Sequence, residues 1–136
     1  MCMRHPFFTL LTVLLCLTTL AFTALAEETA LTGKYNVQGW EPDSESSQTA
    51  DYAGQAVISV MGEIYAFEAT IDGNVYQGAG LYDPETKTLG FAFQDASHKE
   101  TGLTLFKVTS KGLEGRWVYL DSEGKKVGME IWKKTK

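Results

Sequence analysis

Short segments of alternating residues, separated by turn residues, run through almost the whole chain after Glu27 and limit what it can fold into. Each segment is rich in Val, Ile, Tyr, Phe and Thr, with apolar and polar side chains in alternation. A period of two is typical of a β-strand that buries one face. No window of about 11 or more residues after Glu27 carries a helical stripe. The sequence therefore predicts an all-β fold.

Turn residues divide this part of the chain into eight segments, and we expect a strand in each. The clearest turn is Asp72-Gly73-Asn74, because these residue types tolerate positive φ. Asp83-Pro84-Glu85-Thr86 marks another, since proline fixes φ at its second position. The expected strands are 33–38, 55–61, 64–71, 75–82, 89–94, 103–109, 113–120 and 126–132.

Most of the connections between these segments are very short, which makes neighbouring strands pair antiparallel. Eight sequential antiparallel strands form a meander, and closure into a barrel removes the two exposed edges. The sequence therefore predicts an eight-stranded up-and-down barrel, with a two-sheet β-sandwich as the alternative. Interior glycines, at Gly78, Gly80, Gly90, Gly115 and Gly128, are interpreted as the positions where the strands curve or a bulky neighbour needs room.

The last hairpin can be given a register. If Ser122-Glu123-Gly124 forms the loop, Arg116 lies opposite Glu130. Trp117 and Tyr119 would then share the core face with Met129 and Ile131, and Arg116 and Glu130 would form an exposed ion pair.

The N-terminus has the three parts of a secretory leader. Arg4 is followed by an apolar run from Phe7 to Leu25 and by the small-x-small site Ala24-Leu25-Ala26. We therefore expect a signal peptide at 1–26, a single domain at 27–136, and a periplasmic or secreted protein with no membrane span after cleavage. An uncleaved membrane anchor is the alternative.

Composition limits the chemistry. From Glu27 on there are 17 acidic and 11 basic residues, which disfavours nucleic-acid binding. Cys2 and Cys16 both lie in the expected leader, so the domain has no disulfide and no thiol nucleophile. His98 is its single histidine, and the acidic loop with Asp43 and Asp51 lacks the spacing of a calcium-binding loop. We expect no metal, no cofactor and no catalytic residues.

Aromatic residues are the one candidate for a site. Three pairs lie two residues apart, so the members of each pair share one face of their strand: Tyr65 and Phe67, Phe91 and Phe93, and Trp117 and Tyr119. They would either fill a solid core or line a pocket for a small apolar ligand.

The first segment, Leu31-Thr32-Gly33-Lys34-Tyr35, resembles the opening of the avidins and, more loosely, the G-x-W opening of the lipocalins. The resemblance implies an eight-stranded meander barrel with a ligand in its mouth. Tyr35 replaces the avidin Trp, and Val37 stands where avidins carry a biotin-contacting Asn, so biotin is not the implied ligand. The glycine and aromatic pattern around Gly78, Gly115 and Gly128 also resembles small exported bacterial proteins of unknown function, some of them labelled fibronectin-binding.

These observations favour an exported, non-enzymatic binding protein that holds a small apolar ligand in a barrel. The alternative is an envelope or host-facing module that binds a protein partner, in the manner of an adhesin or an inhibitor. Trp40 and Trp132 motivate this alternative, because exposed aromatic residues are common interface anchors. A third hypothesis is an enzyme that uses tyrosines and carboxylates as acid and base.

Overall fold

The computed structural model describes residues 30–121 and 126–136. All the strands of the described residues lie in one compact unit, Thr32–Lys136. The expected signal peptide, 1–26, lies outside the described residues and stays a prediction. So does the expected loop Ser122-Glu123-Gly124.

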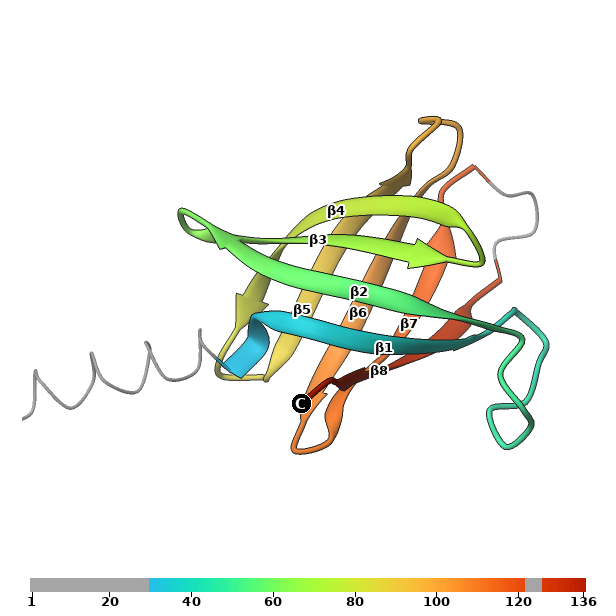
Figure 1. Cartoon of the computed structure of the whole chain (residues 1–136), viewed down its shortest axis with the longest axis horizontal. Helices are drawn as coiled ribbons and strands as arrows, with labels where there is room; N and C mark the ends of the chain where they lie inside the picture. Colours follow the sequence, from blue (N-terminus) through green and yellow to red (C-terminus); the bar gives the residue numbers. More distant parts are fainter. Residues whose placement is uncertain (1–29, 122–125) are drawn as a thin grey trace, which may run out of the picture. The chain divides into compact units, whose positions relative to one another are not determined.

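All eight expected strands are present, which confirms the all-β prediction (Figure 1). The observed ends lie within a few residues of the predicted ones. The strands are β1 (Gly33–Trp40), β2 (Tyr52–Met61), β3 (Ile64–Ile71), β4 (Asn74–Asp83), β5 (Thr88–Asp95), β6 (Thr101–Thr109), β7 (Gly112–Tyr119) and β8 (Gly128–Lys134).

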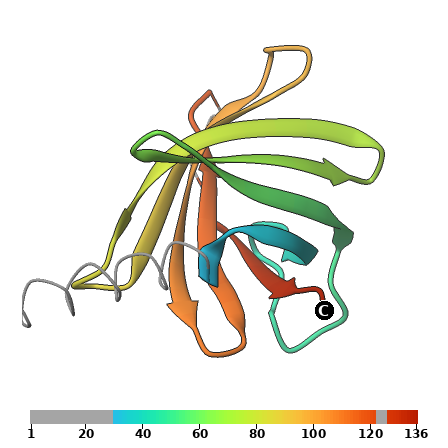
Figure 2. The same cartoon turned by 60° about the vertical axis from the view of Figure 1, so that its left-hand side comes forward.

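Each strand pairs antiparallel with the next, and β1 also pairs with β8, so the sheet is a closed barrel rather than a sandwich. Figures 1 and 2 show β1, in blue, beside β8, in red, at this closing seam. The seam is continuous from Tyr35 opposite Lys134 to Trp40 opposite Met129. Closure leaves neither terminal strand of the meander with a free edge.

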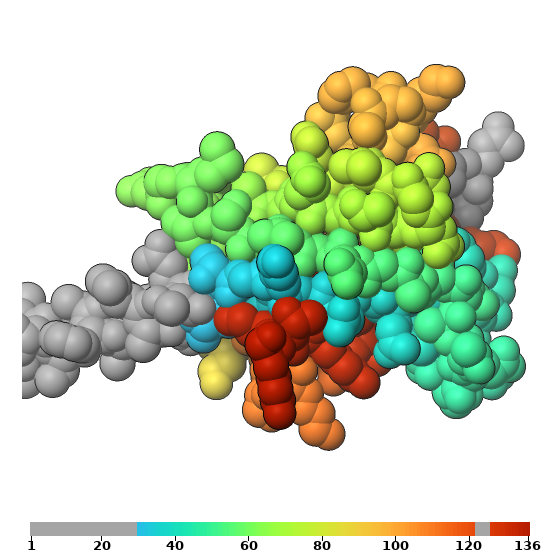
Figure 3. All heavy atoms as spheres, viewed as in Figure 1, coloured from blue at the N-terminus to red at the C-terminus, as the bar shows by residue number. Residues whose placement is uncertain are grey.

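In a meander, alternate connections lie at the same end of the barrel. We call the end with the β1–β2, β3–β4, β5–β6 and β7–β8 connections the mouth, and the opposite end the base. The β3–β4 connection lies at the predicted turn Asp72-Gly73-Asn74. Asp72 and Gly73 form the turn, both with positive φ, at 48° and 83°, and Asn74 already begins β4. At the mouth the longest connection, residues 41–51, forms a lobe drawn in teal at the right of Figure 3.

The base half of the barrel is solid. Inward side chains from most of the strands meet there, and Phe106 lies 4.9 Å from Trp132, centroid to centroid. Phe67 bridges Phe91 and Trp132, at 4.9 and 5.4 Å. The largest side chains that are fully buried are Trp132, Tyr35, Phe91, Phe106, Ile58, Leu89, Leu113 and Val37. Burial of this apolar area is the main force that holds a domain without disulfides together.

The predicted register of the last hairpin is wrong by one residue. Arg116 lies opposite Met129, and Glu130 lies opposite Gly115. A one-residue slip reverses the faces of a strand, so Met129 is exposed while Glu130 and Trp132 point inward. The predicted ion pair between Arg116 and Glu130 is therefore absent. Burial of the larger Trp132, which is 1% exposed, decides the register, because an aromatic side chain of this size buries more apolar area than Met or Ile.

Aromatic rings cover the inward glycines. In five directly opposed pairs, a side chain added to the glycine would meet a ring atom of its partner within 2.4 Å. These pairs are Gly39 with Tyr52, Gly78 with Phe67, Gly102 with Phe93, Gly115 with Phe106 and Gly128 with Trp117. Each ring therefore lies against the wall of the barrel, in the space that the glycine leaves. Of the glycines that we interpreted as sites of curvature or of room for a bulky neighbour, Gly78, Gly115 and Gly128 provide room for rings. A Cβ at Gly80 would first meet the backbone carbonyl of Gly90, and one at Gly90 would make only an ordinary contact with Leu105.

Candidate functional site

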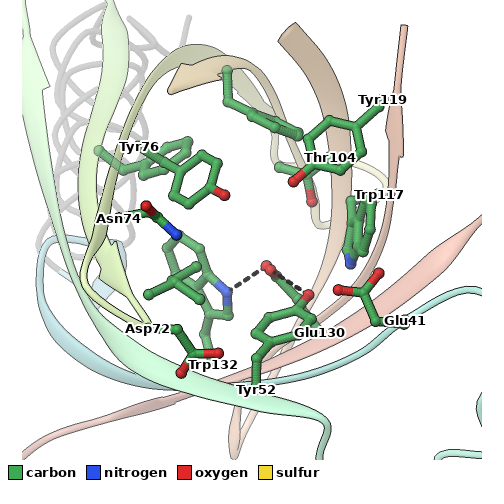
Figure 4. A pocket seen from close by; sticks show the side chains of 13 residues that line it. Glu41, Tyr52, Asp72, Asn74, Tyr76, Thr104, Trp117, Tyr119, Glu130 and Trp132 are labelled. Atoms are coloured by element: carbon green, nitrogen blue, oxygen red, sulfur yellow. Dashed lines mark hydrogen bonds between the residues drawn. The ribbon is translucent and has the colours of Figure 1, made fainter. Parts of the chain in front are cut away.

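The mouth half of the barrel holds a cavity of about 180 Å³ (Figure 4). Its wall is built by aromatic side chains from most of the strands, and its polar groups come mainly from strand ends and from the β3–β4 turn. The lining residues are Glu41, Tyr52, Phe67, Ile71, Asp72, Asn74, Tyr76, Phe93, Thr104, Trp117, Tyr119, Glu130 and Trp132. The cavity exists because the rings at this end lie against the wall over Gly39, Gly78, Gly102 and Gly128 instead of crossing the interior.

The structure brings four of the six predicted site residues to this cavity, namely Phe67, Phe93, Trp117 and Tyr119. The other two belong elsewhere in the barrel interior. Tyr65 packs edge-on against Tyr82 at 6.3 Å, toward the base. Phe91 is 2% exposed and contacts Phe67 and Phe106, so it supports the floor of the cavity from below.

A carboxylate that the sequence analysis placed outside, Glu130, lies at the centre of the cavity. Its Oε1 accepts a hydrogen bond of 2.8 Å from the Tyr52 hydroxyl, and its Oε2 accepts one of 2.8 Å from Trp132 Nε1. The two dashed lines in Figure 4 mark these bonds. Tyr52 and Glu130 are 78 residues apart in sequence, and only closure of the barrel brings them together.

Burial changes the proton affinity of both partners. It raises the pKa of the Glu130 carboxyl; the hydrogen bonds from Trp132 and Tyr52 oppose this rise, and the negative charge of Glu41 adds to it. Burial also raises the pKa of Tyr52, and the adjacent Glu130 adds to this rise. Tyr52 therefore keeps its proton at neutral pH and acts as a hydrogen-bond donor that fixes the position of the carboxylate.

Trp117 presents a polar group without a hydrogen-bond partner to the same cavity. The residue is 7% exposed, and its Nε1 makes no hydrogen bond with any described residue. The indole lies edge-on to Tyr52 at 6.5 Å, and its N–H is near enough to the Tyr52 hydroxyl to lower the pKa of that phenol, although the two groups do not meet the geometry of a hydrogen bond. In Figure 4 the nitrogen faces the space between the Glu41 and Glu130 carboxylates. A buried N–H group without a partner costs free energy, so it favours any ligand that brings an acceptor.

Two further tyrosines complete the wall. Tyr76 and Tyr119 face each other across the cavity in Figure 4, and their hydroxyls interact. The Tyr76 hydroxyl also lies 3.5 Å from Glu100 Oε2, in the β5–β6 connection. Burial raises the pKa of both phenols, so both stay protonated at neutral pH.

The loop over this wall is held by Asp95. Its carboxylate accepts hydrogen bonds from the backbone N–H groups of Lys99 and Glu100, at 2.8 and 2.9 Å, and from Ser97. These bonds, first of all the one from Ser97, lower the pKa of Asp95 to about 2. The polar loop that contains His98 is therefore an ordered part of the mouth.

The two tryptophans on which the interaction-module alternative was based are both buried. Trp40 is 5% exposed, and its Nε1 donates to the carbonyl of Gln48 at 3.1 Å. Trp132 lies in the core. That alternative therefore loses the observation that motivated it.

A second hollow lies on the outside of the barrel, over β4 to β7. It is larger than the mouth cavity, at about 1180 Å³, but more open to solvent, and the exposed side chains of Leu81, Leu103 and Leu105 lie along it. Such an open surface does not enclose a small molecule, so the mouth cavity is the better candidate for a site.

Within residues 30–121 and 126–136, no three His, Cys, Asp or Glu side chains are grouped so that they could hold a metal ion. The described residues contain no helix that is long and apolar enough to cross a membrane.

Comparison with known proteins gives no relative. No family model, no curated protein and no solved structure matches this chain. The likeness of the first strand to the avidins therefore remains a local resemblance in sequence. The structure by itself assigns the chain to the class of closed, eight-stranded antiparallel β-barrels.

Proposed function

We propose that this chain is an exported, non-enzymatic binding protein that holds a small ligand in the mouth of its barrel. The observation that carries this proposal is the aromatic cavity of about 180 Å³, with the unpartnered N–H of Trp117 inside it. An apolar wall with a few fixed polar groups is typical of a small-molecule site.

The size of the cavity limits the ligand. A cavity of about 150 Å³ in another protein accommodates benzene, so this one suits a ligand of roughly six to nine non-hydrogen atoms. The aromatic wall favours the apolar body that the sequence analysis expected. Glu130 and Trp117 add one acceptor and one donor, so the ligand should also have a polar end.

A variant that fills the cavity tests this proposal. Ile71 lines the mouth, and its neighbour Thr70 is exposed on the outer face. We expect Ile71→Trp to abolish the binding of small aromatic and aliphatic fragments, while Thr70→Trp binds them as the unaltered protein does. Ligand-detected NMR measures the binding, and the indole resonance of Trp117 reports the site.

Two results would contradict the proposal. One is that no fragment of this size binds to the unaltered protein. The other is that fragments bind equally well to Ile71→Trp, which would place them outside the cavity.

A further inference from the structure

We infer that the ligand of the mouth cavity is a small organic cation, with an ammonium or quaternary ammonium group and a hydrogen-bond acceptor a few bonds away. This inference rests on the proposed function and names the ligand class for the same cavity. Three properties of the described residues support it: the charge of the lining, the aromatic faces and the unpartnered donor.

All the charged side chains that line the cavity are acidic. They are Glu41, Asp72 and Glu130, and the lining includes no Lys, Arg or His. Glu130 is the most enclosed of the three, and the Tyr52 and Trp132 donors hold both of its oxygens in place. A buried carboxylate is costly unless a positive charge accompanies it. A cationic ligand would supply that charge, whereas an anionic one would be repelled.

Seven aromatic rings line the cavity with these carboxylates: Tyr52, Phe67, Tyr76, Phe93, Trp117, Tyr119 and Trp132. The face of an aromatic ring carries partial negative charge and attracts a cation, by about 0.5–2 kcal/mol for each well-placed ring. A quaternary ammonium group presents methyl groups to such rings, so the same wall serves an apolar surface and a positive charge.

The N–H of Trp117 explains why the cation should also carry an acceptor. This donor is buried and makes no hydrogen bond with the described residues. A hydroxyl or carbonyl oxygen of the ligand would satisfy it while the ammonium group lies near Glu130. An anionic carboxylate would fit this position poorly, because Glu41 faces the same space (Figure 4).

Choline is a suitable probe, because it joins a quaternary ammonium group to a hydroxyl and fits the size of the cavity. Its uncharged analogue 3,3-dimethyl-1-butanol has the same shape, with carbon in place of nitrogen. We expect the purified protein to bind choline at least about tenfold more tightly than the analogue in isothermal titration calorimetry, which corresponds to about 1.4 kcal/mol.

The failure of this inference can be distinguished from that of the proposed function. Equal affinity for the two compounds, or tighter binding of the neutral one, would overturn the cation inference and leave a neutral-ligand cavity. If neither compound nor any neutral fragment binds, the proposed function fails as well.

A charge-removing variant gives a second, independent readout. In Glu130→Gln the amide can still accept from Trp132 and can donate to the Tyr52 hydroxyl, so the shape of the site is kept. We expect this variant to lose most of the preference for choline over the analogue. The matched control is Glu68→Gln, since Glu68 is exposed on the outer face of β3 and should not alter the preference. An unchanged preference in Glu130→Gln would contradict the inference.

Discussion

The side chain of Glu130 lies inside the barrel because Trp132, two residues further on, lies inside as well. Residues two apart in a strand share a face, so burial of the tryptophan places the carboxylate in the cavity. The position is tolerated because it is at the mouth, where Tyr52 and Trp132 each donate a hydrogen bond to it. The chain thus gains the burial of a large aromatic residue and acquires a polar group where a ligand can reach it.

This arrangement predicts a specific pH dependence of stability. Because the pKa of Glu130 is raised in the folded state, its favourable contribution is fully present below its ordinary pKa of 4.5 and is lost as the pH rises through the higher folded value. Glu130→Gln removes this loss. We expect the stability of the variant relative to the unaltered protein to increase from acid to neutral pH, measured as urea midpoints.

Glu68→Gln is the control for this experiment, since its carboxylate is exposed on β3 and should give a much smaller change. If Glu130→Gln becomes less stable relative to the unaltered protein as the pH rises, the assigned direction of the pKa shift is wrong.

At the scale of the strands, opposed pairs of glycine and aromatic residues hold rings against the wall of the barrel in both its solid and its hollow half. Gly115 and Phe106 belong to the solid base, whereas Gly128 and Trp117 belong to the cavity. In both pairs the ring occupies the space in front of the glycine. At the mouth this leaves the centre of the barrel open.

A methyl group on one of these glycines should therefore displace a ring. In Gly128→Ala the added Cβ would lie 2.2 Å from Trp117 Cε2, so the indole must move toward the cavity. We expect a loss of about 1–3 kcal/mol in the free energy of unfolding, typical of overpacking, measured by urea denaturation. The Trp117 fluorescence should shift at the same time.

Gly90→Ala is the matched control, because its added Cβ would meet only Leu105 Cδ1, at 3.5 Å, as its nearest neighbour. We expect a change within about 0.5 kcal/mol. Equal losses in the two variants would show that strand propensity, and not the covered ring, governs these positions.

At the scale of the whole barrel, charge is divided between the two ends. Within the described residues, the mouth connections and strand ends carry eight acidic residues against Lys99, Lys126 and His98, and Lys126 is paired with Asp43. The acidic ones are Glu41, Asp43, Glu45, Asp51, Asp72, Asp95, Glu100 and Asp121. The base connections and the C-terminal residues carry Lys87, Lys111, Lys133, Lys134 and Lys136 against Glu63, Asp83 and Glu85. A ligand that approaches the mouth therefore meets a negative field.

This negative field predicts that the affinity for a cation depends on the salt concentration, whereas the affinity for an uncharged compound of the same shape does not. The distance over which exposed charges act falls from about 30 Å at 0.01 M salt to about 3 Å at 1 M. We expect the affinity for choline to fall several-fold over this range, while that for 3,3-dimethyl-1-butanol stays constant or rises slightly. The same titration calorimetry measures both, and parallel changes for the two compounds would exclude an electrostatic contribution from the mouth.

The order of residues close together in the sequence was enough to predict the strands, the β3–β4 turn and most of the aromatic lining. Alternation predicted the eight strands, and Asp72-Gly73-Asn74 predicted the β3–β4 turn, because strand formation and tight turns depend on near neighbours. Four of the six aromatic residues proposed for a site do line the cavity. Glu68 of β3 is exposed between the buried residues Phe67 and Ala69, as the alternation of a strand requires.

The tertiary structure alone decided the register of β8, and with it the chemistry of the cavity. The alternation in 128–134 fits either face, since Met129 and Ile131 compete with Trp132 for the interior. The choice depends on β1 and β7, which flank β8 in the closed barrel, and on the space that Phe106 and Phe67 leave for an indole. Those contacts join residues far apart in the chain. The sequence therefore determined the strands and the apolar lining, and closure determined that a carboxylate stands among the rings.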